Sequence, residues 1–360
     1  MELMYQNKKE KIEIMNDVYN SNPLQFQNTN YLIYDDNYNA LKGLLAGGFN
    51  EKVDLIYIDP PFNTNQTFVI GEQRASTISR CKEGQIAYED EKTVEEYLEF
   101  LRWRLILMRE LLTIEGSIYL HIDYKIGHYV KIIMDEVFGK ENFKNDITRI
   151  KSNPKNFFRR AYGNEKDLIL YYAKDASKNI WNDIRVELSI DELKDKFTKK
   201  DEYGYYNTIP LHAPGESNGI TGSAWRGILP PEGRHWRTNP KEFDVLDSEG
   251  KIEWSKTGNP RIKKYAHEHI GKKIQDIWSF KDPQNPVYPT EKNGNMIKQI
   301  ILQSSKEDSI VMDCFAGGGG TLVSAIELGR KFIGIDNSEL SMSVIKKRLH
   351  NAEYTYIETA

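Results

Sequence analysis

The chain has 360 residues, 39% hydrophobic and 28% charged, which is enough for about two domains with packed cores and excludes a disordered or fibrous protein. With 49 Lys and Arg against 53 Asp and Glu, its formal net charge is −4, and this total by itself predicts no polyanionic partner. Its two cysteines cannot form a disulfide framework, and no run of about 18 apolar residues could cross a membrane. We therefore expect a cytoplasmic protein without membrane association and, because its histidines are scattered, without a metal site.

The N-terminal part predicts an alternation of strands and helices. Residues 31–34 form a short apolar strand, and a helix is expected over residues 40–45. Residues 53–58 predict a second buried strand, which ends where two prolines follow Asp59, because proline cannot donate to a sheet ladder. A long polar loop is expected over residues 63–92.

The next predicted helix begins with a capping box, in which Thr93 precedes Glu96 by three residues. Its apolar residues recur on one face: Val94, Tyr97, Leu98, Leu101, Leu105, Met108 and Leu112. We expect the helix to end at Gly116, and a buried strand over residues 117–122 to follow. A further helix then ends at Gly139.

The pattern changes between residues 176 and 279, where Gly and Pro interrupt often and no periodic segment is long. We interpret this region as a separate, irregular insert. The C-terminal part returns to α/β alternation, with strands over residues 309–312 and 331–335 and helices over residues 321–328 and 338–349.

A glycine-rich loop follows the strand at residues 309–312, where a tight turn would let the backbone approach a nucleotide-like ligand. Asp336 comes 19 residues after Gly317, the spacing at which a carboxylate can bind the hydroxyls of an adenosine ribose. No Gly-Lys-Ser/Thr follows the glycines, which argues against an ATP-binding loop. Because only one helix is expected after Asp336, the other strands must come from the N-terminal region, as in a circularly permuted, Rossmann-like α/β sheet.

Asp59, Pro60, Pro61 and Phe62 stand at the carboxyl end of a predicted strand, the edge where open α/β sheets bind ligands. The Asp59 carboxylate and the Pro60 carbonyl are acceptors, and Phe62 offers an aromatic face. These groups suit a planar ligand with an exocyclic amine. A turn with a buried phenylalanine could have the same sequence, but the adenosine-type loop favours a binding site.

Together these motifs resemble the β group of amino-methylating DNA methyltransferases, and in detail the methylation subunits of type III restriction systems and their shorter relatives. The matching segments are residues 34–37, 59–64, 116–123, 288–292 and 313–319. The family usually has Pro where this chain has Cys314, and Ser or Thr where it has Gly318. It also commonly has Pro where this chain has Asn293. These differences would make the cofactor loop looser.

The order of the motifs is also that of the β group. The resemblance implies a catalytic half in residues 1–175, a target-recognition insert in residues 176–279 and a cofactor-binding half in residues 280–360. It thus agrees with the permutation inferred from the strands.

The resemblance implies methyl transfer from S-adenosylmethionine to the exocyclic N6 of adenine in a flipped-out base of double-stranded DNA. Family members that act on cytosine usually carry Ser in place of Asp59, so adenine is favoured. Cytosine N4 is the nearest alternative, and an RNA or protein amino-methyltransferase on the same sheet is the next. A nicotinamide-dependent oxidoreductase is the alternative from another class. The implied partners are a cognate restriction endonuclease and a second copy of the chain.

The resemblance also assigns roles to residues. Catalysis falls to Asp59, Pro60 and Pro61, with Phe62 stacking on the flipped base. The loop after residue 313 would meet the methionine moiety, Asp336 the ribose, Asp36 the adenine amine, and Thr290 with Lys292 the methionine carboxylate. The full cofactor set is Asp36, Thr290, Lys292, Asp313, Phe315, Gly317, Gly319, Thr321 and Asp336.

Two basic segments, residues 144–166 and 251–275, each carry a local net charge of +5 together with aromatic residues, as grooves that follow a nucleic-acid backbone do. Bases would be read within residues 203–237, where Trp225, Trp236, His235 and three arginines offer planar donors suited to guanine edges and phosphates. The candidates for DNA contact are Lys151, Lys155, Arg159, Arg160, Arg226, Arg234, Arg237, Arg261, Lys263 and Lys264. The near-neutral total charge therefore conceals segregated basic segments, and these favour a DNA partner.

Overall fold

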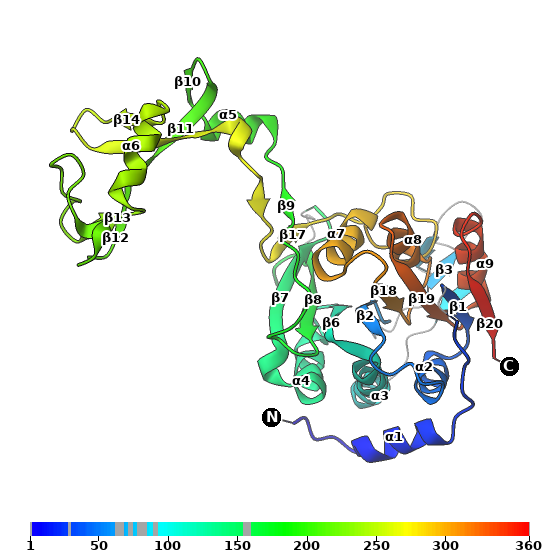
Figure 1. Cartoon of the computed structure of the whole chain (residues 1–360). Helices are drawn as coiled ribbons and strands as arrows, with labels where there is room; N and C mark the ends of the chain where they lie inside the picture. The colour runs from blue at the N-terminus through cyan, green and yellow to red at the C-terminus, as the bar shows by residue number, and fades with distance from the viewer. Residues whose placement is uncertain are drawn as a thin grey trace. The chain divides into compact units, whose positions relative to one another are not determined.

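The computed structural model describes residues 2–27, 30–61, 68–70, 75–77, 85–88, 93–153 and 160–359. It divides into two compact units (Figure 1). The first combines the residues up to Asp183 with those from Gln275 onward, and the second is Ile184–Ile274. Both ends of the second unit lie inside the range 176–279 expected for the insert. Among the described residues, no helix has the length and apolar character needed to span a lipid bilayer.

A nine-stranded sheet forms the centre of the first unit, in the order β17-β7-β8-β6-β2-β18-β19-β1-β20. Its strands are β1 (Tyr31–Tyr34), β2 (Val53–Ile58), β6 (Leu112–Ile122), β7 (Phe143–Ile150), β8 (Lys166–Ala173), β17 (Ile277–Ser279), β18 (Ile310–Asp313), β19 (Lys331–Asp336) and β20 (Thr355–Glu358). From β6 to β20 every neighbouring pair is parallel, whereas β8 runs antiparallel to both of its neighbours.

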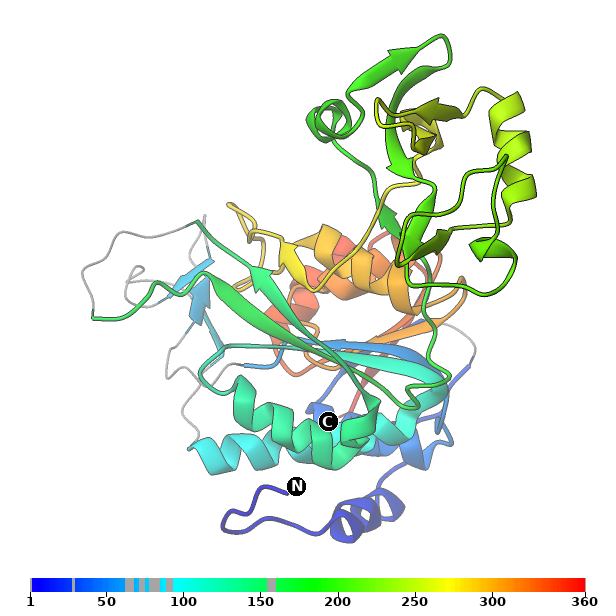
Figure 2. The ribbon, with the colours of Figure 1, turned by 90° about the vertical axis from the view of Figure 1, so that its left-hand side faces the viewer.

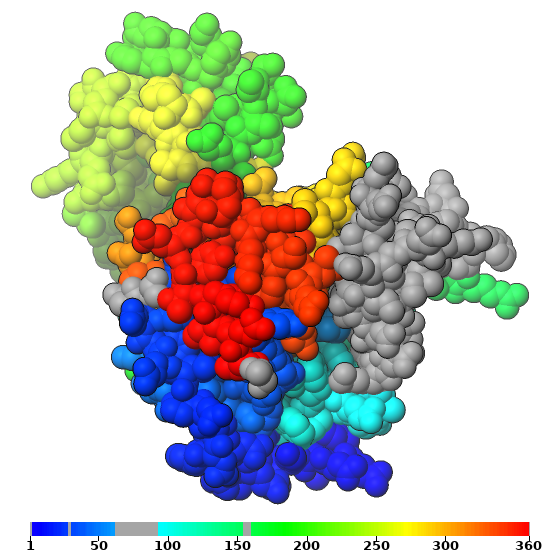
Figure 3. Space-filling model, turned by 90° about the vertical axis from the view of Figure 1, so that its right-hand side faces the viewer, coloured from blue at the N-terminus to red at the C-terminus, as the bar shows by residue number. Residues whose placement is uncertain are grey.

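The N-terminal and C-terminal parts of the chain share this sheet. β2 pairs with β18, with Leu55 opposite Val311, and β1 lies between β19 and β20. Figure 3 shows the resulting contact, in which the C-terminal segment (red) covers N-terminal residues (blue). The predicted circularly permuted α/β sheet is confirmed. Because parallel strands end at one edge, the loops after β1, β2, β18 and β19 meet there.

Helices cover both faces of the sheet (Figure 1, Figure 2). One face carries α2 (Asn37–Ala46), α3 (Val94–Leu111) and α4 (Gly127–Phe138), and the other carries α7 (Gly294–Ser304) and α8 (Gly320–Glu327). Two further helices are seen among the described residues of this unit: α1 (Lys11–Tyr19) packs on α2 and α3, and α9 (Glu339–Arg348) follows β19. The core lies between the sheet and α2–α4, where Leu41, Leu105 and Ile133 are fully buried.

The predicted capping box of α3 is present: Thr93 Oγ1 accepts from the Glu96 backbone, and the Glu96 side chain accepts from the Thr93 backbone. The predicted end at Gly116 is wrong, because the helix ends at Leu111 and the chain passes directly into β6. β-branched Thr113 and Ile114 favour a strand there. Gly116 lies within β6, where a Cβ would approach a Leu112 methyl to 2.9 Å.

Two further expectations are wrong. The region expected as a polar loop contains β3 (Phe68–Ile70), β4 (Ala75–Thr77) and β5 (Gln85–Tyr88), which form an antiparallel sheet. The final helix is followed by β20, which was missed because its four residues include only one that is both apolar and β-branched, Ile357.

The second unit is a folded domain and not an irregular insert. Its antiparallel sheet has the order β10-β11-β15-β14. The elements are β9 (Arg185–Val186), α5 (Ile190–Lys196), β10 (Lys199–Asp201), β11 (Gly204–Pro210), β12 (His212–Pro214), β13 (Arg234–Trp236), α6 (Pro240–Ser248), β14 (Ile252–Trp254), β15 (Pro260–Tyr265) and β16 (Lys272–Lys273). Its small core contains Leu211, Trp225, Trp236, Phe243 and Ile252. The short strands explain why the sequence showed no long periodic segment.

Candidate active site

A cavity of about 680 Å³ opens at the carboxyl edge of the large sheet, entirely within the first unit. The loops after β1, β2, β18 and β19 line it together with the segment before α7. Many of the sequence-predicted residues meet here: Asp36, Asp59, Pro60, Pro61, Thr290, Lys292, Asp313, Phe315, Gly317, Thr321 and Asp336. Of the remaining predicted residues for this site, Phe62 lies outside the described residues.

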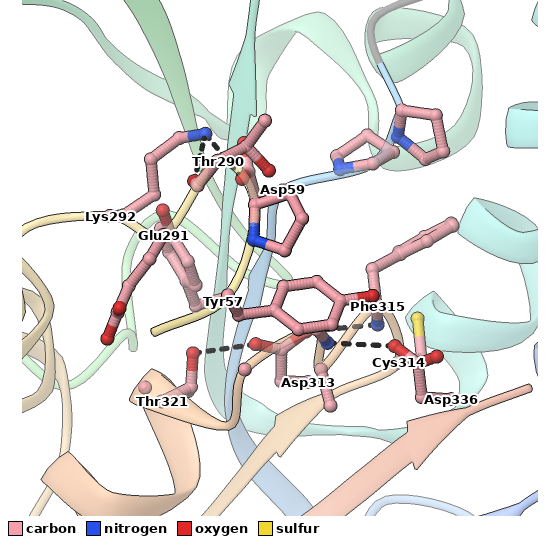
Figure 4. A pocket seen from close by; sticks show the side chains of 18 of the residues that line it. Tyr57, Asp59, Thr290, Glu291, Lys292, Asp313, Cys314, Phe315, Thr321 and Asp336 are labelled. Carbon is pink, nitrogen blue, oxygen red and sulfur yellow. Dashed lines mark hydrogen bonds and ion pairs between the residues drawn. The ribbon is translucent and has the colours of Figure 1, made fainter. Parts of the chain in front are cut away.

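The glycine loop after β18 is held in shape by Asp313 (Figure 4). One carboxylate oxygen accepts from Thr321 Oγ1 at 2.6 Å and the other from the Phe315 backbone N–H at 3.0 Å. Burial raises the pKa of Asp313 to about 7, although both hydrogen bonds oppose the shift. The hydrogen bond between Thr321 and Asp313 therefore holds the two ends of the loop together.

Positive φ angles and close neighbours together require glycine in this loop. Gly317 and Gly319 have φ of 52° and 74°, in the left-handed region that other residues rarely adopt. At Gly318, where the family usually has Ser or Thr, a Cβ would lie 2.7 Å from the Cβ of Tyr288. The neighbouring Cys314 is buried, with its Sγ 3.7 Å from the sulfur of Met108. The departure at Gly318 thus follows from packing against Tyr288.

Asp336 ends β19 and faces the glycine loop. Its carboxylate accepts from the Gly317 backbone N–H at 2.8 Å and from the Ser338 backbone N–H at 3.0 Å. Burial raises the pKa of Asp336, against these hydrogen bonds. Each oxygen keeps a lone pair that could accept from a ligand hydroxyl.

Asp36 caps α2, accepting from the Tyr38 backbone at 2.9 Å, and also receives the guanidinium of Arg104 at 3.1 Å. Arg104 is buried on α3 and stacks over the Phe100 ring, 3.7 Å from its centroid. The sequence reading missed Arg104, although an arginine within the apolar pattern of a helix was a usable signal. Its ion pair fixes the position of the Asp36 carboxylate beside the cavity.

Asp59 follows β2 directly and has two different oxygens. The Lys292 ammonium lies 2.6 Å from Oδ2 (Figure 4). Oδ1 is buried, has no hydrogen-bond partner among the described residues, and lies 3.9 Å from Nδ1 of His121. One oxygen is therefore held by a cation, and the other is able to accept a new donor.

Lys292 was predicted to meet a methionine carboxylate, but the structure places its ammonium on Asp59. The same nitrogen donates to the Thr290 carbonyl at 3.2 Å. Thr290 has φ of 61°, and this left-handed conformation costs a β-branched residue about 1–3 kcal/mol. The strained turn brings Lys292 back towards β2.

The DNA candidates differ in their surroundings. Lys155 and Arg159 lie outside the described residues, and Arg160 is exposed. Lys151 lines the cavity, with its Nζ 2.6 Å from buried Asp167. Arg149, counted in the same basic segment, is fully buried. Part of that segment's charge is thus compensated inside the fold.

In the second unit, Arg234, Arg237 and Lys264 are exposed. The other candidates are engaged: Arg226 with Asp244 and Asp247, Arg261 with Thr208, and Lys263 with Asp201. The expectation that Trp225 and Trp236 contact bases is wrong, because both are buried in the core around Phe243.

Comparisons with known proteins agree on one family. The family N6_N4_Mtase, described as DNA methylase, matches residues 53–347. The chain is 41% identical over 325 residues to the type II methyltransferase M.EcaI of Enterobacter cloacae, covering 89% of this chain and 69% of that protein. It is 26% identical to the Mod subunit of the type III restriction-modification enzyme StyLTI of Salmonella typhimurium, covering 89% of this chain but only 55% of the relative.

A solved structure is also similar. The crystal structure of the M1.HpyAVI–SAM complex has a TM-score of 0.48 and 18% identity, covering 89% of this chain and 98% of that one.

Proposed function

Because the chain belongs to the N6_N4_Mtase family of DNA methylases, we propose that it transfers a methyl group from S-adenosylmethionine to the N6 amine of adenine at specific sites in DNA. Family membership confirms the resemblance inferred from the sequence motifs. The observation that carries the proposal is the position of Asp59, whose Oδ1 has no hydrogen-bond partner in the described part of the chain and lies in the same cavity as the glycine loop and Asp336.

The residues present fit S-adenosylmethionine, which supplies a methyl group activated by a sulfonium. The cavity is of ligand size, and the glycine loop leaves no room for side chains at Gly318 or Gly319. Asp336, oriented by two backbone N–H groups, would accept from the ribose hydroxyls. Asp36, held by Arg104, would accept from the adenine amine.

The exocyclic amine of a base is a weak nucleophile, because its lone pair is delocalised into the ring. Asp59 Oδ1 and the Pro60 carbonyl would accept the two amine protons and so localise that lone pair on nitrogen. Lys292 holds the other oxygen of Asp59, and the buried setting strengthens each of these interactions. The chain's contribution is therefore orientation of the amine and stabilisation of the charge that develops on it.

Adenine is favoured over cytosine because position 59 is an aspartate. We further propose that the second unit recognises the target sequence, and that the enzyme serves a restriction-modification system, as the names of the Mod relatives indicate for those proteins. The proposed partners are a cognate endonuclease and a second copy of the chain. We propose that the enzyme acts in the cytoplasm, where the DNA of the cell lies.

The test is incubation of the chain with unmethylated DNA and S-adenosylmethionine, followed by mass spectrometry of the nucleosides. We expect N6-methyladenine. Recovery of N4-methylcytosine alone would overturn the adenine assignment, and calorimetric binding of NAD without binding of S-adenosylhomocysteine would overturn the methyltransferase proposal.

A further inference from the structure

A buried chain of ionisable side chains lies behind Asp59, and orientation of the amine does not use it. His121 of β6 is fully buried. Its Nε2 lies 3.3 Å from Oδ2 of Asp167, while its Nδ1 lies 3.1 Å from the Tyr57 hydroxyl and 3.9 Å from Oδ1 of Asp59. The imidazole therefore stands between two carboxylates.

Asp167 is kept ionised although it is only 2% exposed. Burial alone would raise its pKa, but hydrogen bonds from His121 and Lys151, together with the charge of Lys151, outweigh burial and bring the pKa well below its ordinary value. Lys151 lies 2.6 Å away, and Arg149 adds a second cation at 3.5 Å. An ionised Asp167 accepts the N–H of Nε2, which leaves the lone pair of Nδ1 facing Tyr57 and Asp59.

Methylation of an amine releases a proton, and this proton needs an acceptor. The nitrogen lone pair forms the N–C bond, the electrons of the S–C bond stay on sulfur, and the methylated nitrogen carries a positive charge until one N–H bond breaks. Asp59 Oδ1 is the nearest acceptor in the proposed arrangement. However, the Lys292 ammonium lies 2.6 Å from the other oxygen of Asp59, so a proton on Oδ1 would leave that cation without its counter-charge.

We propose that His121 takes up this proton through Asp59, which makes His121 a positioning residue and proton acceptor for methyl transfer. The inference rests on the proposed function. In the first step the N–H bond breaks and an O–H bond forms on Oδ1. For the second step Oδ1 and Nδ1, which are 3.9 Å apart, must close to hydrogen-bond distance, and the Tyr57 hydroxyl must turn its proton away from Nδ1. The O–H bond on Oδ1 then breaks and an N–H bond forms on Nδ1. The resulting imidazolium lies between the carboxylates of Asp59 and Asp167, which stabilise it.

The charges around His121 suit this cycle. Burial is the largest effect and lowers the pKa of His121, so the ring is neutral and able to accept a proton at neutral pH. Asp167 and Asp59 act in the opposite direction, and Lys292 acts with burial. Tyr57, whose own pKa burial raises, stays a neutral hydroxyl that donates to Nδ1 before the transfer and accepts from it afterwards. Once the product leaves, the proton can return through Asp59 to solvent in the cavity.

A purely structural role for this cluster is the competing explanation. Burying an ion cluster contributes little to stability compared with apolar packing, so stability alone gives no reason for it. The cluster also reaches the cavity, since Asp59, Lys151 and Asp167 all line it. Its placement therefore favours a part in the reaction.

The test compares His121→Gln with the wild type in single-turnover methyl transfer to duplex DNA, between about pH 5.5 and about pH 8.5. Glutamine can bond Asp167 but cannot take up a proton. We expect the wild-type rate to be level at neutral pH and to fall only at a pH below the ordinary histidine pKa, where His121 becomes protonated. We expect His121→Gln to transfer the methyl group roughly 10²-fold more slowly and to show no loss of rate in acid. It should bind S-adenosylhomocysteine as tightly as the wild type does.

The matched control is His128→Gln, which changes an exposed histidine of α4 and should leave rate and pH profile unchanged. Asp167→Asn is the second variant, used if His121→Gln does not fold. Loss of the negative charge should lower the pKa of His121 further, so the fall in rate should move to lower pH. Thermal unfolding identifies folded variants.

A folded His121→Gln with the wild-type rate, or with the wild-type fall in acid, would overturn the inference while leaving the proposed function standing. So would an unchanged profile in Asp167→Asn. Failure of the wild type to methylate DNA would instead refute the proposed function.

Discussion

The ammonium nitrogen of Lys292 lies 2.6 Å from Oδ2 of Asp59, so a cation from the segment before α7 holds the carboxylate that follows β2. The two residues are more than two hundred positions apart and meet because β2 and β18 are neighbours in the permuted sheet. The pair joins the motif expected to act on the base to the motif expected to bind the cofactor. Both side chains are largely buried, so solvent screens their interaction little.

Lys292→Met should separate the role seen in the structure from the role inferred by resemblance. If Lys292 acts on Asp59, the single-turnover rate should fall by roughly 10- to 100-fold, while S-adenosylhomocysteine binds as before. If it binds the methionine carboxylate, calorimetry should instead show affinity for S-adenosylhomocysteine reduced about tenfold or more. Lys292→Arg retains the positive charge and serves as the control for charge alone.

Asp59→Asn should abolish methyl transfer, with a loss of roughly 10³-fold or more, because an amide cannot offer two accepting oxygens to Lys292 and an amine. Affinity for S-adenosylhomocysteine should change little, since the glycine loop and Asp336 are untouched. Equal loss of binding and transfer would show that Asp59 acts structurally. Scintillation counting of tritiated methyl groups on DNA, together with calorimetry, measures both.

Gly318→Ala should weaken S-adenosylhomocysteine binding by roughly tenfold or more, because its Cβ would lie 2.7 Å from Tyr288 and the loop must shift. Gly320→Ala is the matched control at the start of α8. There the nearest atom to an added Cβ is a methyl of Ile297 at 3.5 Å, an ordinary contact. Equal affinities of the two variants in calorimetry would show that Tyr288 does not constrain the loop.

Asp313 should make stability depend on pH. Its pKa is about 7 in the folded state and raised above the ordinary value of 3.8, so the folded protein binds the extra proton between these values. The contribution of this protonation to the free energy of unfolding is thus complete below about pH 4. It is lost as the pH rises towards 7, by up to about 1.4 kcal/mol per pH unit. Asp313→Asn should remove this slope from the free energy of unfolding. Urea titrations at several pH values measure it, and a variant with the wild-type slope would contradict the assignment.

The sequence predicted strand positions correctly where a short apolar run ends at Asp, Pro or Gly. β1 and β2 have the predicted bounds, β19 ends one residue later than predicted, and β18 is shifted by one residue at both ends. The predicted order of motifs also implied the permuted sheet. These elements are local, because a strand bounded by Asp, Pro or Gly needs no knowledge of its partner.

Partners across the sheet could not be read from the sequence. His121 meets Asp167 because β6 pairs with β8, with Ile122 opposite Leu168, and β8 was not predicted. Likewise, a count of basic residues includes Arg149, although Asp282 and Asp167 compensate its charge. Linear charge counts measure composition, whereas exposure and pairing depend on tertiary contacts.

The exposed cations of the second unit provide the remaining prediction. Arg234 and Lys264 are exposed and form no ion pair with a described carboxylate, in contrast to Arg226, which pairs with Asp244 and Asp247. If both contact phosphates, Arg234→Ala with Lys264→Ala should lower the slope of log Kd against log salt concentration by about 1.8.

Arg226→Ala is the matched control and should change this slope less, because its charge is already compensated. Fluorescence anisotropy with labelled duplex DNA, in a salt series, measures all three proteins. An unchanged slope in the double variant would exclude these two residues from phosphate contact, and a slope reduced equally in Arg226→Ala would show that its ion pairs open on DNA binding.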